Sequence, residues 1–255
     1  SKPALFISNF FTKGHERSIQ AKKNIAATFV IKGFSILISL IFVPIVLNYV
    51  NPDGYGIWLT LSSIVGWFSF FDIGLTQGLR NKFAEAKARG DDNIAQIYVS
   101  TTYAILGIIF FSVWLIFIIV NNFLDWSSIL KVSESMRSDV SILAIIVFTY
   151  FCIIFVLRII TTIFLADQKS AKSSLIDLLG QVASLIFIFI LVKTTEGSII
   201  KLGIALCVSP ILVLVIANIV SYKGNYRKYR PVVSQVKFVY AKGLFNLGLI
   251  FCYSL

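Results

Sequence analysis

Six apolar runs, each long enough to cross a lipid bilayer, dominate this 255-residue sequence. A hydrocarbon core of about 30 Å needs roughly 20 helical residues, and lipid offers the backbone no hydrogen-bond partners outside the segment itself. The runs therefore predict transmembrane helices at 25–50, 55–79, 97–121, 139–165, 174–193 and 198–221. A seventh run starts near residue 242. We expect an all-α, polytopic membrane helix bundle with six complete transmembrane helices plus a truncated seventh.

The composition agrees with lipid as the solvent. Hydrophobic residues make up 57% of the chain and charged residues 14%, whereas soluble domains average about 45–50% and about 25%. The three cysteines and the single histidine show neither a disulfide pattern nor metal-ligand spacing. Sequence motifs of hydrolases and nucleotide-binding proteins are also missing. The sequence predicts a protein that is not an enzyme and uses no metal and no cofactor.

The connectors between the apolar runs differ sharply in charge. Most of the 23 Lys and Arg residues fall on one side of the predicted bundle. Those on the other side are Lys131, Arg137, Lys193 and Lys201. Cytoplasmic loops carry the excess of Lys and Arg, so we expect the N-terminus and the basic connectors in the cytoplasm. Membrane lipids explain the net charge of +11 better than nucleic acid does, because the basic residues are spread over several connectors.

These boundaries divide the chain into four predicted parts. They are a cytoplasmic N-terminal segment at 1–24, a six-helix lobe at 25–222, a cytoplasmic connector at 223–241 and the start of a seventh helix at 242–255. The absence of an initiating Met and the unfinished last run indicate a fragment of a longer protein. Segments 80–93 and 222–241 mix basic and apolar residues, which predicts amphipathic helices at the membrane surface, with a solvated loop as the alternative for the second.

Polar side chains inside the first two apolar runs are the strongest indication of function. A charge at the centre of a spanning helix costs about 2.5–3.5 kcal/mol, so such residues usually face a wet cavity or the bundle interior. Helical periodicity aligns two polar stripes, and together they predict a shared aqueous surface. The first stripe is Lys32, Ser35 and Ser39, after Thr28; the second is Ser69, Asp72, Thr76 and Arg80, after Ser62 and Gly66.

Each charged member of the stripes has an alternative explanation. Lys32 either faces the cavity or extends its long stem to the membrane surface. Arg80 either contacts a ligand or only anchors the helix end. Asp72 is too short to reach the surface, so we expect it to pair with a cavity cation, most simply Lys32.

A further pair of charges lies in the fourth and fifth apolar runs. Arg158 is inside the fourth, and Asp177, Gln181 and Ser184 follow one another along one side of the fifth. We predict a structural ion pair between Arg158 and Asp177, with contact to a substrate as the alternative.

The stretch 51–91 resembles a known family. The matching elements are YGIW at 55–58, FDIGL at 71–75 and GLRNKFAEA at 78–86, supported by LDWSSIL at 124–130 and YRPV at 229–232. They resemble the first-to-second helix region of bacterial polysaccharide (O-antigen type) flippases of the multidrug/oligosaccharidyl-lipid/polysaccharide exporter superfamily. The resemblance covers nearly the whole chain after residue 22, as the N-terminal half of such a protein.

The resemblance implies a V-shaped fold of two six-helix lobes around a cationic cavity, in the bacterial inner membrane. Its substrate would be an undecaprenyl-diphosphate-linked oligosaccharide, moved from the cytoplasmic to the periplasmic leaflet by alternating access for polysaccharide or O-antigen biosynthesis. Lys32 and Arg80 are then the candidate diphosphate contacts. A coupling ion and other polysaccharide-assembly proteins are further partners that the resemblance leaves open. The hydroxyls offered to sugar or water are those of Ser35, Ser39, Ser69 and Thr76.

Three other functions remain as alternatives. A cation-coupled drug or metabolite exporter of the same superfamily would use Asp72 as its ion site. A membrane enzyme of polysaccharide assembly would need a catalytic His or acidic motif, and the loops of this sequence hold none. A structural membrane subunit would not need polar stripes on two neighbouring helices.

Overall fold

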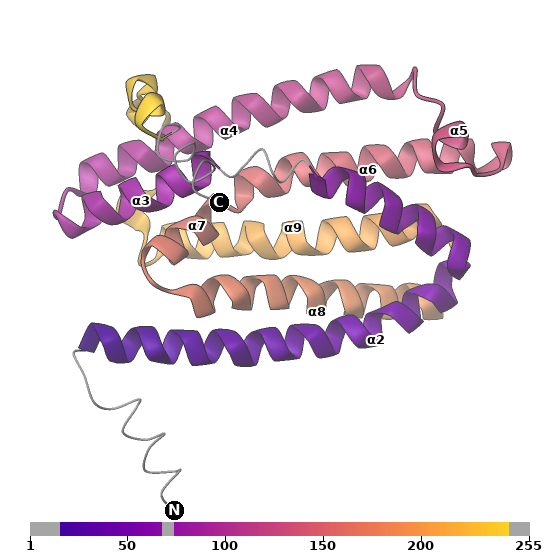
Figure 1. Cartoon of the computed structure of the whole chain (residues 1–255), viewed down its shortest axis with the longest axis horizontal. Helices are drawn as coiled ribbons and strands as arrows, with labels where there is room; N and C mark the ends of the chain where they lie inside the picture. The colour runs from indigo at the N-terminus through magenta and orange to yellow at the C-terminus, as the bar shows by residue number, and fades with distance from the viewer. Residues whose placement is uncertain (1–15, 68–73, 245–255) are drawn as a thin grey trace, which may run out of the picture.

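The computed structural model describes residues 16–67 and 74–244, and every regular element in those two ranges is helical. The long helices lie side by side in an elongated bundle (Figure 1). In chain order the elements are α2 (Glu16–Trp67), α3 (Leu75–Ala88), α4 (Asp92–Asn121), α5 (Trp126–Leu130), η2 (Glu134–Met136), α6 (Arg137–Leu157), α7 (Ile159–Ala166), α8 (Ser170–Thr194), α9 (Ile199–Lys223), η3 (Arg227–Tyr229), η4 (Val233–Gln235) and η5 (Phe238–Tyr240).

Several of these helices are long and apolar enough to cross a bilayer, so the chain is a multi-pass helical membrane protein. The five candidate spans within 16–67 and 74–244 are Lys22–Trp67, Asp92–Asn121, Glu134–Ala166, Ser170–Thr194 and Ile199–Lys223. The first of them contains the predicted helix 25–50 and the beginning of the predicted helix 55–79. Residues 68–73 of the second prediction, and most of the predicted seventh helix, lie outside the described residues. The five candidate spans within the described residues therefore include parts of all six predicted helices, and the count of six plus a partial seventh stays a prediction.

Helix α2 is broken at Asn51. This residue has φ 62° and ψ 171°, and Pro52 follows it. Proline disfavours the helical conformation in the residue before it, and its own fixed φ suits the first turn of a new helix. The Asn51 Oδ1 accepts a hydrogen bond from the Gly54 N–H at 2.9 Å, which caps the second half. The chain reverses direction here (Figure 1). The connection between the predicted helices 25–50 and 55–79 is therefore a one-residue break, with the helix resuming at Pro52.

A second break divides the predicted helix 139–165 into α6 and α7. It falls at Arg158, whose φ and ψ are −69° and −9°. The Asn218 side chain of α9 donates to the Leu157 carbonyl at 3.0 Å, and the Thr161 hydroxyl donates to the Arg158 carbonyl at 2.7 Å. Backbone carbonyls at a break inside a membrane protein need such partners because lipid supplies none. The break is thus satisfied by hydrogen bonds, and it leaves the Arg158 side chain on the wall of the bundle.

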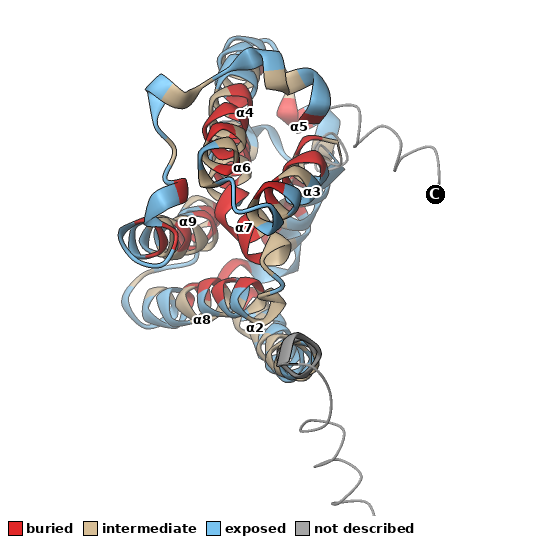
Figure 2. Cartoon of the chain, turned by 90° about the vertical axis from the view of Figure 1, so that its left-hand side faces the viewer, coloured by how far each residue is buried: buried red, intermediate tan, exposed pale blue. Residues whose placement is uncertain are grey.

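One of two apolar cores in the described residues lies around α7, where α3, α4, α6 and α8 meet, and the other joins α2, α6 and α9 (Figure 2). Four α7 side chains, those of Ile159, Ile160, Ile163 and Phe164, have no exposed surface. The first half of α2 differs, because it packs mainly on α8 at the edge of the bundle and exposes large apolar side chains such as Phe29, at 72%. Membrane lipid is the natural solvent for that surface.

The segment after α9 folds back over the end of the bundle where α3 and α4 meet. Tyr226 and Tyr229 are buried there, and the Tyr229 hydroxyl donates to Asp92 at 2.8 Å. The segment 222–241 contains three single-turn 3₁₀ helices after the end of α9, and most of residues 231–240 are exposed. The amphipathic helix predicted at 80–93 is present as α3, which runs from Leu75 to Ala88 and buries its apolar side.

Candidate functional site

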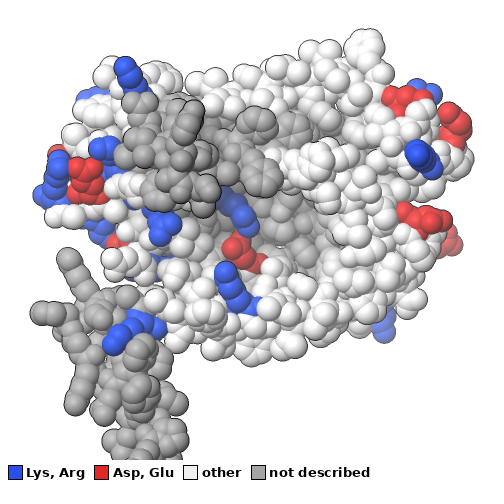
Figure 3. Space-filling view, in the orientation of Figure 1, with Lys and Arg blue, Asp and Glu red and all other residues white. Residues whose placement is uncertain are grey.

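An open cavity of about 780 Å³ lies between both halves of α2 and helices α6, α8 and α9. The space-filling view shows this hollow in the middle of one face, with basic and acidic side chains inside it (Figure 3). Its charged lining residues are Lys32, Arg158 and Asp177. Two cations against one carboxylate make the cavity positive.

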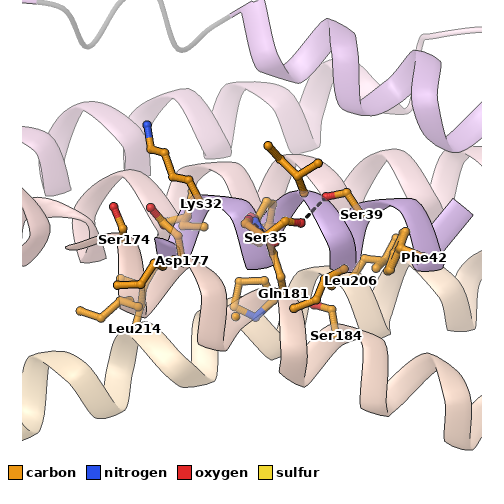
Figure 4. Close-up of a pocket in the computed structure, with 18 of the residues that line it drawn as sticks. Lys32, Ser35, Ser39, Phe42, Ser174, Asp177, Gln181, Ser184, Leu206 and Leu214 are labelled. Atoms are coloured by element: carbon orange, nitrogen blue, oxygen red, sulfur yellow. Dashed lines mark hydrogen bonds between the residues drawn. The ribbon is translucent and has the colours of Figure 1, made fainter. Parts of the chain in front are cut away.

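The α2 wall carries the first predicted polar stripe. Lys32, Ser35 and Ser39 all line the cavity, because residues three or four apart share one side of a helix. The Ser35 hydroxyl donates to Gln181 Oε1 of α8 at 2.5 Å, and the Ser39 hydroxyl donates to the Ser35 carbonyl at 3.0 Å. The Lys32 side chain extends away from α8, as Figure 4 shows. The ion pairs formed among residues 22–67 and 74–244 do not use it.

Arg158 and Asp177 form an ion pair on the opposite wall. The guanidinium lies 2.7 Å from Asp177 Oδ1, and the two side chains are 54% and 45% exposed. The structure therefore brings the predicted pair together, but on the cavity surface and not in a dry interior. A solvent-exposed ion pair contributes only about 0–1 kcal/mol, so a ligand can replace the carboxylate at modest cost.

Other polar and aromatic side chains of the cavity were not predicted as site residues. Ser174, Gln181 and Ser184 extend the polar side of α8 from Asp177, and the spacing of three and four residues was a usable indication. The aromatic lining residues are Phe42, Tyr55, Trp58 and Tyr150. Their rings give the cavity flat apolar surfaces beside the polar tips of the last three.

The second predicted stripe does not line this cavity in the described part of the chain. Thr76 is half-buried and Arg80 exposed, and both lie on α3, away from Lys32. Ser69 and Asp72 lie outside the described residues, and with them the predicted Lys32–Asp72 contact. Within residues 22–67 and 74–244, the Ser62 hydroxyl is buried without a hydrogen-bond partner.

Two basic residues that sequence alone assigns to topology, Lys87 and Lys169, belong to a half-buried network at the α3 end of the bundle. Asp167 is its centre, and we call Asp167, Lys87, Lys169 and Tyr226 the Asp167 network. Lys169 Nζ lies 2.5 Å and the Tyr226 hydroxyl 2.7 Å from Asp167 Oδ2, and Lys87 of α3 pairs with Oδ1. Burial opposes ionisation of Asp167, but hydrogen bonds from Lys169, Lys87 and Tyr226 outweigh it and hold its pKa below the usual value.

Fold and site together define a class: a multi-pass membrane bundle whose long helices enclose an open, positively charged cavity. The profile of the polysaccharide biosynthesis protein family matches residues 21–254. The chain belongs to this family, which confirms the family predicted from 51–91 and places its role in polysaccharide biosynthesis. No curated protein and no solved structure matches it.

Proposed function

We propose that the protein is a flippase that carries a lipid-linked oligosaccharide across the bacterial inner membrane, with its N-terminus in the cytoplasm. Membership of a polysaccharide biosynthesis family supports the substrate class. The observation that carries the proposal is the cavity of about 780 Å³, which presents Lys32 and Arg158 inside a membrane bundle. The diphosphate of an undecaprenyl-diphosphate-linked glycan is a compact anion that matches these cations.

The work of such a protein is physical. A sugar diphosphate is expensive to move through hydrocarbon because its polar groups lose their hydrogen bonds. The cavity replaces water with the hydroxyls of Ser35 and Ser39, the amide of Gln181 and the two cations, while the lipid tail stays outside in the bilayer. This is transport without covalent chemistry, so we propose no catalytic residue and no cofactor.

The Arg158–Asp177 pair suggests how the cavity holds its charge when empty. Each partner lies within hydrogen-bond distance of the other, so neither charge is left alone. A diphosphate entering the cavity competes with Asp177 for the guanidinium, whose planar donors suit phosphate oxygens. Lys32 forms no ion pair with a described carboxylate. A diphosphate can therefore bind its ammonium without first displacing a carboxylate.

Cation-coupled export of a drug is the weaker proposal. It requires a free carboxylate as the ion site, and the cavity carboxylate Asp177 is already paired with Arg158. Asp72 stays the candidate ion site of that alternative. Binding of a cationic dye that Na⁺ or protons compete away, and that is lost in Asp72→Asn, would support it.

The proposal is tested by complementation with the full-length protein. We expect Lys32→Ala to lower surface polysaccharide by about tenfold or more at normal expression, because an anion contact in the cavity is lost. Lys201→Ala is the control, since Lys201 lies on the first turn of α9 and does not line the cavity. Wild-type export by Lys32→Ala would remove Lys32 from the mechanism.

A further inference from the structure

A second hollow lies between α8 and α9 on the side of these helices turned away from the charged cavity. It has a volume of about 490 Å³, and we call it the α8–α9 groove. Leu175 and Leu179 of α8 line it, two residues to either side of Asp177. At 3.6 residues per turn, positions two apart fall on nearly opposite sides of a helix, so the groove and the cavity lie on different sides of α8, and Ile176 is the one residue that lines both. Figure 2 shows the outer sides of both helices as exposed.

The groove has the dimensions and chemistry of a hydrocarbon-chain site. Its lining is almost wholly apolar, and its large side chains remain exposed: Leu179 at 47%, Ile216 at 60% and Val220 at 63%. Ala183 and Ala217 also line it, and their small side chains leave it deep. In a membrane-spanning bundle this surface is in contact with lipid tails. A concave apolar groove between two helices makes more van der Waals contacts with one acyl chain than a flat surface does.

Cations stand at one end of the groove only. Lys172, in the first turn of α8, lines it, with Nζ 4.9 Å from the centre of the Phe164 ring. Lys223 ends α9 three residues after the groove residue Val220, on the same side of that helix. The two helices are antiparallel, so both lysines lie at the same end. The ion pairs formed in the described ranges use neither lysine.

We propose that the α8–α9 groove binds one anionic phospholipid of the bilayer. One acyl chain lies along Leu179 and Ile216, and the phosphate is held at the end by Lys172 and Lys223. A zwitterionic lipid fills the groove equally well but has no net charge for the two lysines, so the site selects anionic headgroups. This inference rests on the membrane location of the chain and not on the flippase proposal.

Lipid retention on the purified full-length protein tests the charge. The protein is exchanged into detergent with equal amounts of phosphatidylglycerol and phosphatidylcholine, and retained lipid is counted by native mass spectrometry. We expect Lys172→Gln to lower phosphatidylglycerol retention about fivefold, the equivalent of about 1 kcal/mol per lysine, and to leave phosphatidylcholine unchanged. Lys193→Gln is the matched control: it lies on the same helix at its other end, also beside an aromatic ring, and outside the groove.

A second variant tests the groove itself. Ala217→Phe fills its depth and keeps both lysines, so we expect it to lower retention of phosphatidylglycerol about as much as Lys172→Gln does. Lys172 is exposed and Ala217 is half-buried, so an unchanged elution volume in size-exclusion chromatography checks the folding of both variants. Parental retention in both variants would overturn the proposal. Displacement of phosphatidylglycerol by equimolar undecaprenyl diphosphate would overturn it too, since the groove would then be a substrate site.

Discussion

The first half of α2 and the α6–α7 pair are both strongly apolar, yet they are packed in opposite ways. Their most apolar windows have mean hydropathies of 2.5 and 2.9, but 6% of the first is buried and 44% of the second. Hydropathy states that a segment prefers lipid, and it does not state how many protein neighbours the segment has. The cavity residues Lys32, Ser35 and Ser39 lie on the poorly packed helix, where a polar side chain disturbs no core.

The largest expected effect contrasts one phenylalanine from each region. Phe164 of α7 is fully buried against Tyr226, with ring centres 5.2 Å apart, whereas Phe34 of α2 is 57% exposed. We expect Phe164→Ala to cost about 3–5 kcal/mol in the free energy of unfolding, because it removes contacts and leaves a cavity. Phe34→Ala should change it by less than about 0.5 kcal/mol. Denaturant titration of both variants in the same detergent measures the difference, and equal losses would show that the two regions are equally packed.

A smaller effect is expected at the Asp167 network and should depend on pH. The folded-state pKa of Asp167 is lowered from its usual 3.8, so its ionisation stabilises the fold above that value and the contribution is lost as pH falls through the folded pKa. At pH 7, Asp167→Asn should cost about 1–3 kcal/mol, since three hydrogen bonds to a carboxylate are weakened.

The control for this prediction is the parent protein in acid. Thermal unfolding of parent and variant at pH 7 and at pH 3 should show the gap in Tm narrowing at the lower pH, because pH 3 lies below the usual pKa of 3.8, where the unfolded chain takes up the proton and the stabilisation from the charge starts to be lost. A gap that stays constant between the two pH values would mean that the charge of Asp167 is not what stabilises this end of the bundle.

The smallest effect on stability is expected in the cavity. Asp177→Asn and Arg158→Gln should each change the free energy of unfolding by less than about 1 kcal/mol, because their ion pair is half-exposed. Export should separate them: Arg158→Gln removes a proposed phosphate contact and should reduce it, whereas Asp177→Asn keeps the cation. Surface polysaccharide measured alongside unfolding checks both expectations. If the two variants lose export equally and lose stability as well, the pair is structural.

Sequence predicted the helical class and the family well, because long apolar runs and the 51–91 block depend on local patterns. It also predicted that Lys32, Ser35 and Ser39 share a surface, since helical periodicity alone decides that. The break at Arg158 was not predictable in this way. The Asn218 side chain that bonds the Leu157 carbonyl at this break belongs to α9. A local sequence pattern does not indicate a hydrogen-bond partner that lies so far along the chain.

The composition of the candidate site was predicted less completely for the same reason. The prediction for Thr76 and Arg80 assumes the periodicity of one continuous helix from Ser62, whereas the orientation of α3, which begins at Leu75, follows from the burial of its apolar side. Tertiary packing places three aromatic side chains, those of Tyr55, Trp58 and Tyr150, on the wall of the cavity. In the sequence they cannot be distinguished from aromatic residues that face lipid. The Asp167 network joins residues of α3, the α7–α8 turn and the segment after α9, so only the folded chain brings it together.

The dependence of α2 on α8 also sets an order of events during synthesis. Ser35 of α2 bonds Gln181 of α8, and Tyr49 of α2 bonds Thr195 directly after α8, each across 146 residues of sequence. At a synthesis rate of about 5–20 residues per second, Gln181 is made roughly 7–30 s after Ser35. During that time the backbone of α2 is hydrogen-bonded within its own helix, and lipid surrounds the helix. The wall that bears Lys32 can therefore join the cavity only after most of the other described helices have been made.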